Sequence, residues 1–510
     1  MKKIIFIVLF IWGINYLLNA QEDVNGVIIS EDDNLTVVQV WGNHYERGYA
    51  QGYLLADQMS DLLSNYLIPQ FGSYMSSAKE VVAAGQHISI ANKYFTEAQG
   101  VIDGVADAGI DTAGIDYRDI LVANSFLDLQ GFSSFKHLDF GTACSALMSW
   151  GDATVNTTLS GESVISRHLD WTVNSSITEN QVMVAHIPSE SDEQNWVMIG
   201  FAGQIGALSG VNTNGLAAFQ NMMSDFSGQQ AQVNQAYQPV WFTLRDALEM
   251  SDYNSDGQHN TNDLRAAIES NAQGYADGYL ISCLASADSG VDSLTALVSA
   301  ITPTDPKIVN RTNAYDDDIP GDNLYVANSQ IKRNDEQNYC FRYNAVASAI
   351  GAGEDISTEA NWSIMRDNSG ISGNIQFMQF VPDQRYINIS AYRNDSPAYT
   401  HDSTRYYLDD LFDGSFFVPS EKHTQAFCHI YPNPVTDKAT IKFTGEPNEL
   451  FTCRIYNELG HLISLKHSLR PNTLTLSDIS MNAGMYFLIL SGNKGTKHKE
   501  KFVVTTQQGR

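Results

Sequence analysis

The order of helical and strand-like blocks constrains the fold of this sequence more than any other feature. Apolar residues recur at helical spacing over residues 44–138 and again over 236–300. Residues 144–225 and 323–394 instead contain short apolar runs separated by turn residues, as strands do. Because strand groups are flanked by helix groups, the sequence predicts a layered α+β domain with sheets inside and helices outside.

The first 20 residues have the layout of a secretory signal peptide. Lys2 and Lys3 precede an apolar run from residue 4 to 12, and residues 18–20 (LNA) offer a small-residue cleavage site. The alternative is an uncleaved membrane anchor. No later segment is long and apolar enough to span a bilayer, so we expect an exported mature chain without a transmembrane segment.

The chain is acidic and contains few cysteines. Its formal net charge of −28 argues against nucleic acid or an anionic membrane surface as a partner. Five cysteines are too few for a disulfide scaffold. Cys283 could pair with Cys340, or Cys428 with Cys453, which leaves Cys144 as the candidate free thiol.

The composition changes near residue 415. Residues 416–427 are typical of a linker, and residues 428–510 alternate short apolar runs with Pro, Asn and Gly turns, which predicts a small β-sandwich. This end resembles the C-terminal sorting domain of type IX secretion substrates, on the segments YPNP (431–434), IYNELGHLI (455–463), MNAGMYFLIL (481–490) and KFVV (501–504). The resemblance implies recognition by the type IX secretion machinery and a secreted or cell-surface protein. A generic sandwich domain is the alternative.

An insertion at about residues 240–275 contains the acidic segment DYNSDGQHNTND, residues 252–263. Its oxygen-bearing residues occupy the ligand positions of an EF-hand loop, with Gly257 at the turn: Asp252, Asn254, Asp256, Gln258, Asn260 and Asp263. Asp263 stands where an EF-hand has Glu, as in dockerin loops. We predict a structural Ca²⁺ site, and the alternative is a solvated turn between two helices.

Cys144 stands at the head of a predicted β-hairpin. The strand that it begins is followed by turn residues and then by the strand SVISRHLDW, residues 163–171. A hairpin would bring Arg167 and Asp170 back towards Cys144, and an arginine near a thiol favours the nucleophilic thiolate. A lone cysteine can also be a small buried hydrophobe.

Three further polar residues are candidates for the same site. Asn221 lies at a predicted strand end, where its side-chain amide could donate to an oxyanion. Asn328 also ends a predicted strand, and Arg342 begins a predicted helix. Individually, each of these residues is also compatible with turn or surface chemistry.

Together these segments resemble the N-terminal-nucleophile (Ntn) hydrolases, in particular the acyl-CoA:6-aminopenicillanate acyltransferase family, which is kin to acid ceramidase and choloylglycine hydrolase. The resemblance covers about residues 35–400. It rests on the segments HYERGYAQGYLLAD (44–57), ACSALMSWGDAT (143–154), SRHLDW (166–171), GVNTNGL (210–216) and VANS (326–329). It implies a four-layer αββα sandwich with a catalytic region over 144–415, and a cysteine hydrolase acting on linear amide bonds without a catalytic cofactor.

The resemblance also implies how such a chain becomes active. The Cys144 thiol would attack the carbonyl of Ala143, and hydrolysis would separate residues 21–143 as a propeptide or an α-chain. The new α-amine, with an ordinary pKa of about 8, would be the general base for its own thiol. The other roles follow: Asp170 would orient the amine, Arg167 would tune the thiol, and Asn221 would stabilise the oxyanion, with Asn328 and Arg342 completing the network. The substrate would be a small acyl-amide.

The sequence departs from the family pattern at three positions. Ala143 replaces the usual Gly, His168 replaces Asn, and Ser329 replaces His. Four alternatives stay open: a phospholipase B-like hydrolase of acyl esters, an acyltransferase, an inactive secreted binding protein, and a thiol protease with a Cys–His pair. The last lacks a distinctive His motif.

Overall fold

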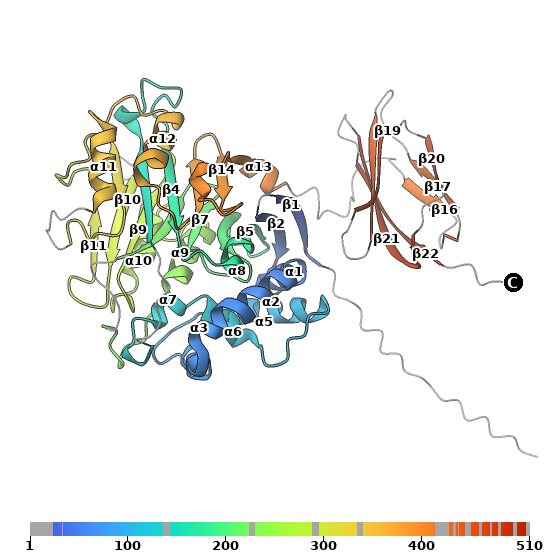
Figure 1. The fold of residues 1–510 in the computed structure, drawn as a ribbon, viewed down its shortest axis with the longest axis horizontal. Helices are drawn as coiled ribbons and strands as arrows, with labels where there is room; N and C mark the ends of the chain where they lie inside the picture. Colours follow the sequence, from blue (N-terminus) through green and yellow to red (C-terminus); the bar gives the residue numbers. More distant parts are fainter. Residues whose placement is uncertain are drawn as a thin grey trace, which may run out of the picture. The chain divides into compact units, whose positions relative to one another are not determined.

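The computed structural model describes residues 24–32, 34–135, 143–223, 230–287, 295–333 and 340–413, and most of 428–505. The predicted signal peptide and linker lie outside these residues. The chain divides into two compact units, residues 1–417 and 418–510, which are described separately (Figure 1). Among the described residues, no helix combines the length and the apolar character needed to cross a bilayer.

The first unit contains two large sheets. The nine-stranded sheet has the strand order β1 (Gly26–Asp32), β2 (Leu35–Gly42), β5 (Gln181–Pro188), β6 (Trp196–Phe201), β7 (Ser209–Asn212), β8 (Ala217–Met222), β9 (Tyr279–Leu284), β10 (Ala296–Ile301), β11 (Ile308–Arg311). The six-stranded sheet has the order β12 (Asn323–Val326), β3 (Ala143–Ser149), β4 (Val164–Asp170), β13 (Asn374–Val381), β14 (Tyr386–Ala391), β15 (Thr404–Tyr407). Strand β2 pairs with β5 in parallel, and the other pairs in both sheets are antiparallel.

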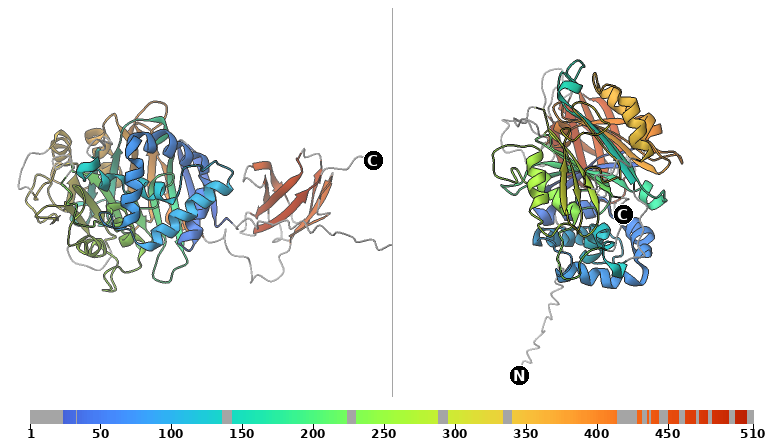
Figure 2. Two further views of the ribbon diagram at one scale, coloured as in Figure 1. Left: turned by 90° about the horizontal axis from the view of Figure 1, so that it is seen from below. Right: turned by 90° about the vertical axis from the view of Figure 1, so that its left-hand side faces the viewer.

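Helices cover the outer faces of the two sheets (Figure 2). The helices associated with the nine-stranded sheet are α1 (His44–Leu54), α2 (Ala56–Asp61), the π-helix η1 (Leu62–Leu67), α3 (Ile68–Phe71), α4 (Met75–Ala84), α5 (Asn92–Asp107), α6 (Tyr117–Ala123), α7 (Phe126–Leu129), α9 (Val240–Glu249) and α10 (Thr261–Glu269). The helices α11 (Phe341–Ile350) and α12 (Thr358–Ser369) cover the six-stranded sheet. Two short helices, α8 (Ser175–Thr178) and α13 (Leu408–Leu411), follow β4 and β15.

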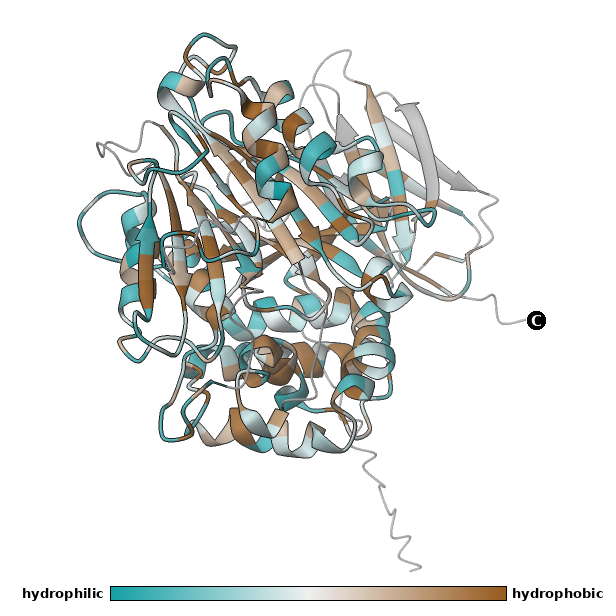
Figure 3. Cartoon of the chain, turned by 60° about the vertical axis from the view of Figure 1, so that its left-hand side comes forward, coloured by the Kyte–Doolittle hydropathy of each residue, from teal (hydrophilic) through white to brown (hydrophobic). Residues whose placement is uncertain are grey.

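Three apolar clusters hold these layers together. One joins the helices to the nine-stranded sheet, a second fills the space between the two sheets, and a third joins α11 and α12 to the six-stranded sheet. Figure 3 shows apolar residues concentrated along the strands. The unit is therefore a mixed α/β structure with large central sheets, as the block order of the sequence predicts.

Small residues allow helices α1 and α5 to pack closely. Gly48 and Gly52 of α1 face Gly100 and Gly104 of α5, and a Cβ atom at Gly48 would lie only 2.1 Å from the Glu97 carbonyl oxygen. Any larger side chain at these positions would separate the helices. A capping box at Asn43 and Glu46 begins α1 and fixes where His44 enters the unit.

One prediction is wrong. The stretch 236–300 is helical only as far as Glu269, because the short apolar runs that follow form β9 and β10; such runs do not distinguish a buried strand from a helix. Of the two possible cysteine pairings, the one between Cys283 and Cys340 does not occur, because both are free thiols. Cys453 is also free, and the side chain of Cys428 lies outside the described residues.

The second unit consists of two antiparallel sheets. One has the order β16 (Cys428–Tyr431), β17 (Lys438–Phe443), β20 (Asn472–Ser477), and the other has the order β19 (Leu462–Leu469), β18 (Phe451–Asn457), β21 (Gly484–Gly492), β22 (Lys497–Val504). Apolar residues from both sheets share one buried cluster, including Ile441, Ile455 and Leu488. Alternating apolar residues in short strands produce this arrangement.

Candidate active site

Strands β3 and β4 form the predicted hairpin around Cys144. Ala143 lies opposite Asp170, Cys144 opposite Leu169, and Ala146 opposite Arg167. Successive side chains of a strand point to opposite faces. Cys144 and Arg167 therefore face the nine-stranded sheet, and Asp170 faces the layer that contains α11.

The Cys144 thiol is buried beside Arg167. The Arg167 Nη2 atom is 3.6 Å from Cys144 Sγ and donates a 2.8 Å hydrogen bond to the Gln220 carbonyl. Burial raises the pKa of Cys144, and the positive charge of Arg167 opposes this rise. Arg167 forms no ion pair with any carboxylate of the described residues, and its Nε and Nη1 atoms are buried without a partner.

The main chain of Cys144 is held by a second set of residues. The Cys144 N–H donates to Asn328 Oδ1 at 3.2 Å, and Arg342 Nη1 donates to the Cys144 carbonyl at 3.3 Å. Arg342 also donates to Asn328 Oδ1 at 2.5 Å and to Asp170 Oδ2 at 3.0 Å. Asn328 and Asp170 thus lie at the peptide bond that joins Ala143 to Cys144.

Asp170 is almost completely buried. Burial raises its pKa to about 6, although Arg342 and Asn374 both lower it. Asn374, which no sequence pattern marks as a site residue, donates to Asp170 Oδ1 at 3.0 Å. An asparagine at the start of a strand pattern is common, so no sequence signal marked it.

Asn221 lies beside these residues, but its side-chain N–H group already donates a hydrogen bond. Its Nδ2 donates to the Ala327 carbonyl at 2.9 Å, next to Asn328, while its Oδ1 is buried without a hydrogen-bond partner. The structure therefore brings all six predicted catalytic residues together: Cys144, Arg167, Asp170, Asn221, Asn328 and Arg342. An oxyanion role for Asn221 requires its amide to change partner.

His168, one of the departures from the family pattern, belongs to a different environment. Its ring stacks on Phe377 at 4.2 Å, and its Nε2 lies 3.1 Å from the Met365 carbonyl. Burial lowers its pKa to about 3, so it is neutral. It points away from the thiol and does not form a Cys–His pair.

An apolar pocket lies on the side of the N-terminal helices. Its lining includes Tyr66 of the π-helix η1, Phe126, Trp171 and Trp241. Trp171 directly follows Asp170. Trp241 donates to the side chain of Gln220, and the main-chain carbonyl of Gln220 accepts from Arg167. A chain of contacts through Gln220 and Arg167 thus links the lining of the pocket to the thiol.

The predicted calcium loop has the expected sharp turn between α9 and α10. Gly257 has φ +78°, and the Asp252 carboxylate accepts from the N–H groups of Asp256 and Gly257. Asp263, at position 12, accepts from the main chain of Tyr253 and is part of the capping box that begins α10. The oxygen donors suit Ca²⁺, but Asp263 must release main-chain N–H groups to bind it; the calcium site stays a prediction.

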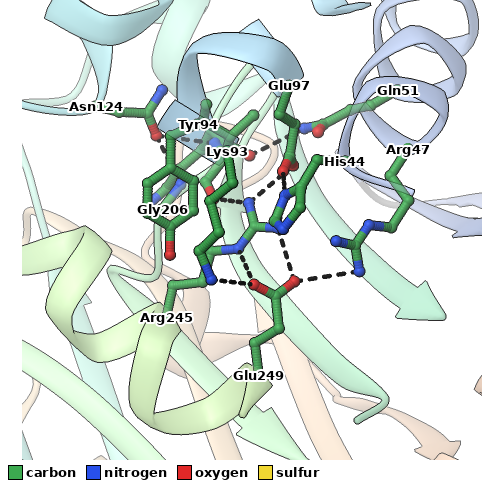
Figure 4. Close-up of polar contacts among 12 residues, drawn as sticks. His44, Arg47, Gln51, Lys93, Tyr94, Glu97, Asn124, Gly206, Arg245 and Glu249 are labelled. Atoms are coloured by element: carbon green, nitrogen blue, oxygen red, sulfur yellow. Dashed lines mark hydrogen bonds and ion pairs between the residues drawn. The ribbon is translucent and has the colours of Figure 1, made fainter. Parts of the chain in front are cut away.

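A second buried charged group, which we call the ionic network, lies between α1, α5, α9 and the segment between β5 and β6 (Figure 4). Arg245 is at its centre, 2.8 Å from Glu97 and 2.7 Å from Glu249. His44 bridges Glu97 at 2.6 Å and Glu193 at 2.9 Å. The remaining members are Arg47, Lys93, Glu190 and Asp246.

Part of this network has the spacing of a metal site. Among the described residues, His44, Glu190 and Glu193 form the one group of three potential ligands whose atoms lie within 4.8 Å of one another. Both His44 ring nitrogens are already engaged, and Arg47 and Lys93 contact the same carboxylates. The network therefore supplies its own cations and does not fit a metal ion.

Comparison with known proteins supports the interpretation of the second unit. Residues 429–505 match the family model of the secretion system C-terminal sorting domain. The predicted sorting domain is thereby confirmed, and it indicates a secreted protein that interacts with the export machinery. The predicted signal peptide stays a prediction.

The chain is similar to two curated proteins at low identity. Protein dcd1B of Dictyostelium discoideum is 22% identical over 245 residues, which is 43% of each chain. Protein dcd1A of the same organism is 26% identical over 213 residues, 36% of this chain and 43% of the relative. The chain thus matches less than half the length of either relative.

Two solved structures match about half of the chain at low identity. The N-acylethanolamine-hydrolyzing acid amidase ortholog of Caenorhabditis elegans is 13% identical, with a TM-score of 0.34, over 52% of this chain and 99% of that chain. A mutant of the conjugated bile acid hydrolase of Clostridium perfringens is 11% identical, with a TM-score of 0.33, over 52% of this chain and 93% of that chain. Both TM-scores are below 0.5.

Proposed function

We propose that this chain is an exported cysteine hydrolase of linear amide bonds, with an Ntn-hydrolase αββα fold, activated by cleavage of the peptide bond between Ala143 and Cys144. One observation carries the proposal: Cys144 presents its thiol to Arg167 and its main-chain nitrogen to Asn328, beside Asp170. A structural cysteine needs neither arrangement.

Activation begins with the thiol. Cys144 Sγ attacks the Ala143 carbonyl carbon, the C–N bond breaks, and the acyl group of the preceding segment moves to sulfur. The nitrogen takes the thiol proton and becomes the Cys144 α-amine. Water then hydrolyses the thioester, which frees the carboxylate of Ala143 and restores the thiol.

Turnover uses the same atoms. The free α-amine, held by Asn328 and Asp170, accepts the thiol proton while sulfur attacks the substrate amide. Arg167 stabilises negative charge on sulfur. The leaving amine takes the proton from the α-amine, and water hydrolyses the acyl-thioester in a second step. No cofactor is required for this chemistry.

The apolar pocket suits the acyl part of the substrate. Its lining is almost entirely apolar, as in sites that bind a hydrocarbon group. Among its residues, the Tyr66 hydroxyl accepts from the Trp171 indole at 2.8 Å. We therefore expect small acyl-amides with an apolar acyl group. Ester-linked acyl groups, as in phospholipase B-like proteins, are the second candidate class.

The N-terminal segment stays bound after cleavage in this proposal. Strand β2 pairs along its whole length with β5. Three ion pairs also join the segment to the rest of the unit: His44 with Glu193, Arg47 with Glu249 and Glu97 with Arg245. Because these contacts join residues before the cleaved bond to residues after it, residues 21–143 remain bound as an α-chain.

The test compares Cys144→Ala with Cys283→Ala, which removes a buried thiol outside the site. Wild type and Cys283→Ala should yield two chains by intact mass, the second beginning at Cys144, and should release acyl groups from an amide panel. Cys144→Ala should stay a single chain and lose on the order of 10⁴-fold or more of its activity. If Cys144→Ala still separated into two chains and still hydrolysed the amide panel, the proposal would be wrong.

The same assay separates the alternatives. Equal or faster release from matched acyl esters identifies the ester hydrolase, and transfer to an added amine identifies an acyltransferase. A folded, exported wild-type protein that neither splits nor turns over either substrate class identifies a binding protein.

A further inference from the structure

We propose that Asn374 is a positioning residue of this site, which fixes the Asp170 carboxylate between Arg342 and the peptide bond before Cys144. The inference rests on the proposed function and deepens it. It starts from an irregularity in the pairing of β13 with β4.

A β-bulge lies directly opposite Asp170. Gln376 pairs with Leu169, but the next pair is Asn374 with Asp170, so Ile375 is an extra residue on β13. Bulges near active sites redirect a side chain. Here the bulge directs the fully buried Asn374 side chain at Asp170.

The orientation of the Asn374 amide is determined by its partners. Its Oδ1 accepts from the Tyr399 N–H at 3.1 Å, so its Nδ2 must be the group that faces Asp170. The same Nδ2 lies 2.8 Å from the Gln376 carbonyl and 3.2 Å from the Leu169 carbonyl. The Asn374 side chain therefore cannot turn without losing several hydrogen bonds.

Asp170 is held at both oxygens as a result. Oδ1 accepts from Asn374 at 3.0 Å, and Oδ2 accepts from Arg342 at 3.0 Å. Two fixed donors keep the carboxylate from rotating and favour its ionised form. The groups that face it are the cations of Arg342 and Arg167 and the thiol of Cys144.

The sign of the effect follows from these contacts. Burial raises the pKa of Asp170 to about 6, and the Asn374 hydrogen bond opposes this rise. Removing the donor raises the pKa further, so the carboxylate is protonated over a wider pH range. A variant without the Asn374 donor should therefore be less active than wild type between pH 6 and 7 and should recover at higher pH.

The most informative variant is Asn374→Asp, which keeps the shape of the side chain and replaces its N–H donor with an oxygen. The acid limb of its kcat/KM profile should move upward by about one pH unit or more, and Asn374→Ala should move it by less. The matched control is Asn361→Asp, a fully buried asparagine of α12 that donates to Leu147 and Ser149. Its melting temperature should drop similarly, but its pH profile should not move.

A second measurement does not depend on turnover. In a double-mutant cycle of Asn374→Ala with Asp170→Asn, the coupling in melting temperature should be present at pH 8 and smaller at pH 5, where the Asp170 carboxyl is protonated. An unmoved acid limb in an active enzyme, or a coupling that is equal at both pH values, would overturn the role of Asn374. Either result leaves the test of Cys144 unaffected, so the two proposals fail separately.

Discussion

Two fully buried arginines of the same unit, Arg245 and Arg167, have opposite surroundings. Arg245 contacts the carboxylates of Glu97 and Glu249 and lies 5.0 Å from the Tyr94 ring and 5.1 Å from the Trp196 ring. Arg167 also lies over a ring, 5.5 Å from that of Phe219, but its polar contacts are a thiol and a main-chain carbonyl, and two of its nitrogens have no partner.

The pKa values of the two guanidinium groups are also shifted in opposite directions. Burial lowers the pKa of each guanidinium, but Glu249 and Glu97 raise the pKa of Arg245 well above its ordinary value, whereas that of Arg167 ends below it. A compensated buried charge is typical of a structural network. A buried positive charge without a carboxylate partner, next to a thiol, is typical of a catalytic site. There the negative charge that it stabilises develops only during the reaction.

Substituting the compensated arginine should have the largest effect on stability. Arg245→Met leaves Glu97 and Glu249 buried without their central cation, which should destabilise the unit by about 3–5 kcal/mol. Urea unfolding measures this, and activity per folded molecule should be unchanged. The control Arg265→Met removes an exposed i,i+4 pair with Glu269 and should cost at most about 0.5 kcal/mol. Equal losses in the two variants would contradict the distinction.

The same substitution at the uncompensated arginine should act on the reaction. Arg167→Met should lower kcat/KM by roughly 10²-fold because the developing charge on sulfur loses its stabilising cation. Its midpoint of unfolding should not fall, since no carboxylate is left unpaired. Arg167→Lys should recover part of the activity. A large loss of stability without a change in kcat/KM would show that Arg167 is structural.

The sequence predicted one of these two regions and not the other. The pairing of Cys144 with Arg167 and Asp170 depends on a short hairpin, in which turn residues determine which side chains meet. The ionic network joins His44, Glu193 and Arg245, residues separated by more than 50 positions along the chain. Nothing in the local pattern of each residue reveals such partners.

The bulge that directs Asn374 towards Asp170 could not be predicted from the sequence for a similar reason. It exists only in the pairing of β13 with β4, strands separated by about 200 residues, and neither strand alone shows it. Strands β9 and β10 were misassigned because a short, fully buried apolar run has no periodicity that excludes a helix. The sequence therefore predicted local pairs and, through the family resemblance, the distant site residues Asn328 and Arg342. It did not predict tertiary contacts that no motif marks.

The 252–263 loop extends the comparison to carboxylates that are neither deeply buried nor paired with arginine. Asp252 and Asp256 are exposed or partly exposed and accept main-chain N–H groups. We expect weak Ca²⁺ binding, with a Kd on the order of 10⁻⁴–10⁻³ M, because Asp263 must exchange its main-chain partners for the ion. Ten millimolar Ca²⁺ should then raise the melting temperature by about 2 °C relative to EDTA.

The variant Asp252→Asn with Asp256→Asn should abolish this shift. It should also lower stability in EDTA, because each amide keeps only one of the two oxygens that accept N–H groups in the loop. Ser357→Ala, which removes the cap of α12 outside the loop, should instead lower stability in both conditions by about 1 kcal/mol and leave the Ca²⁺ shift unchanged. If Ca²⁺ produced no shift in wild type, Asp263 would serve only the helix cap, and the loop would be a turn held by its own main chain.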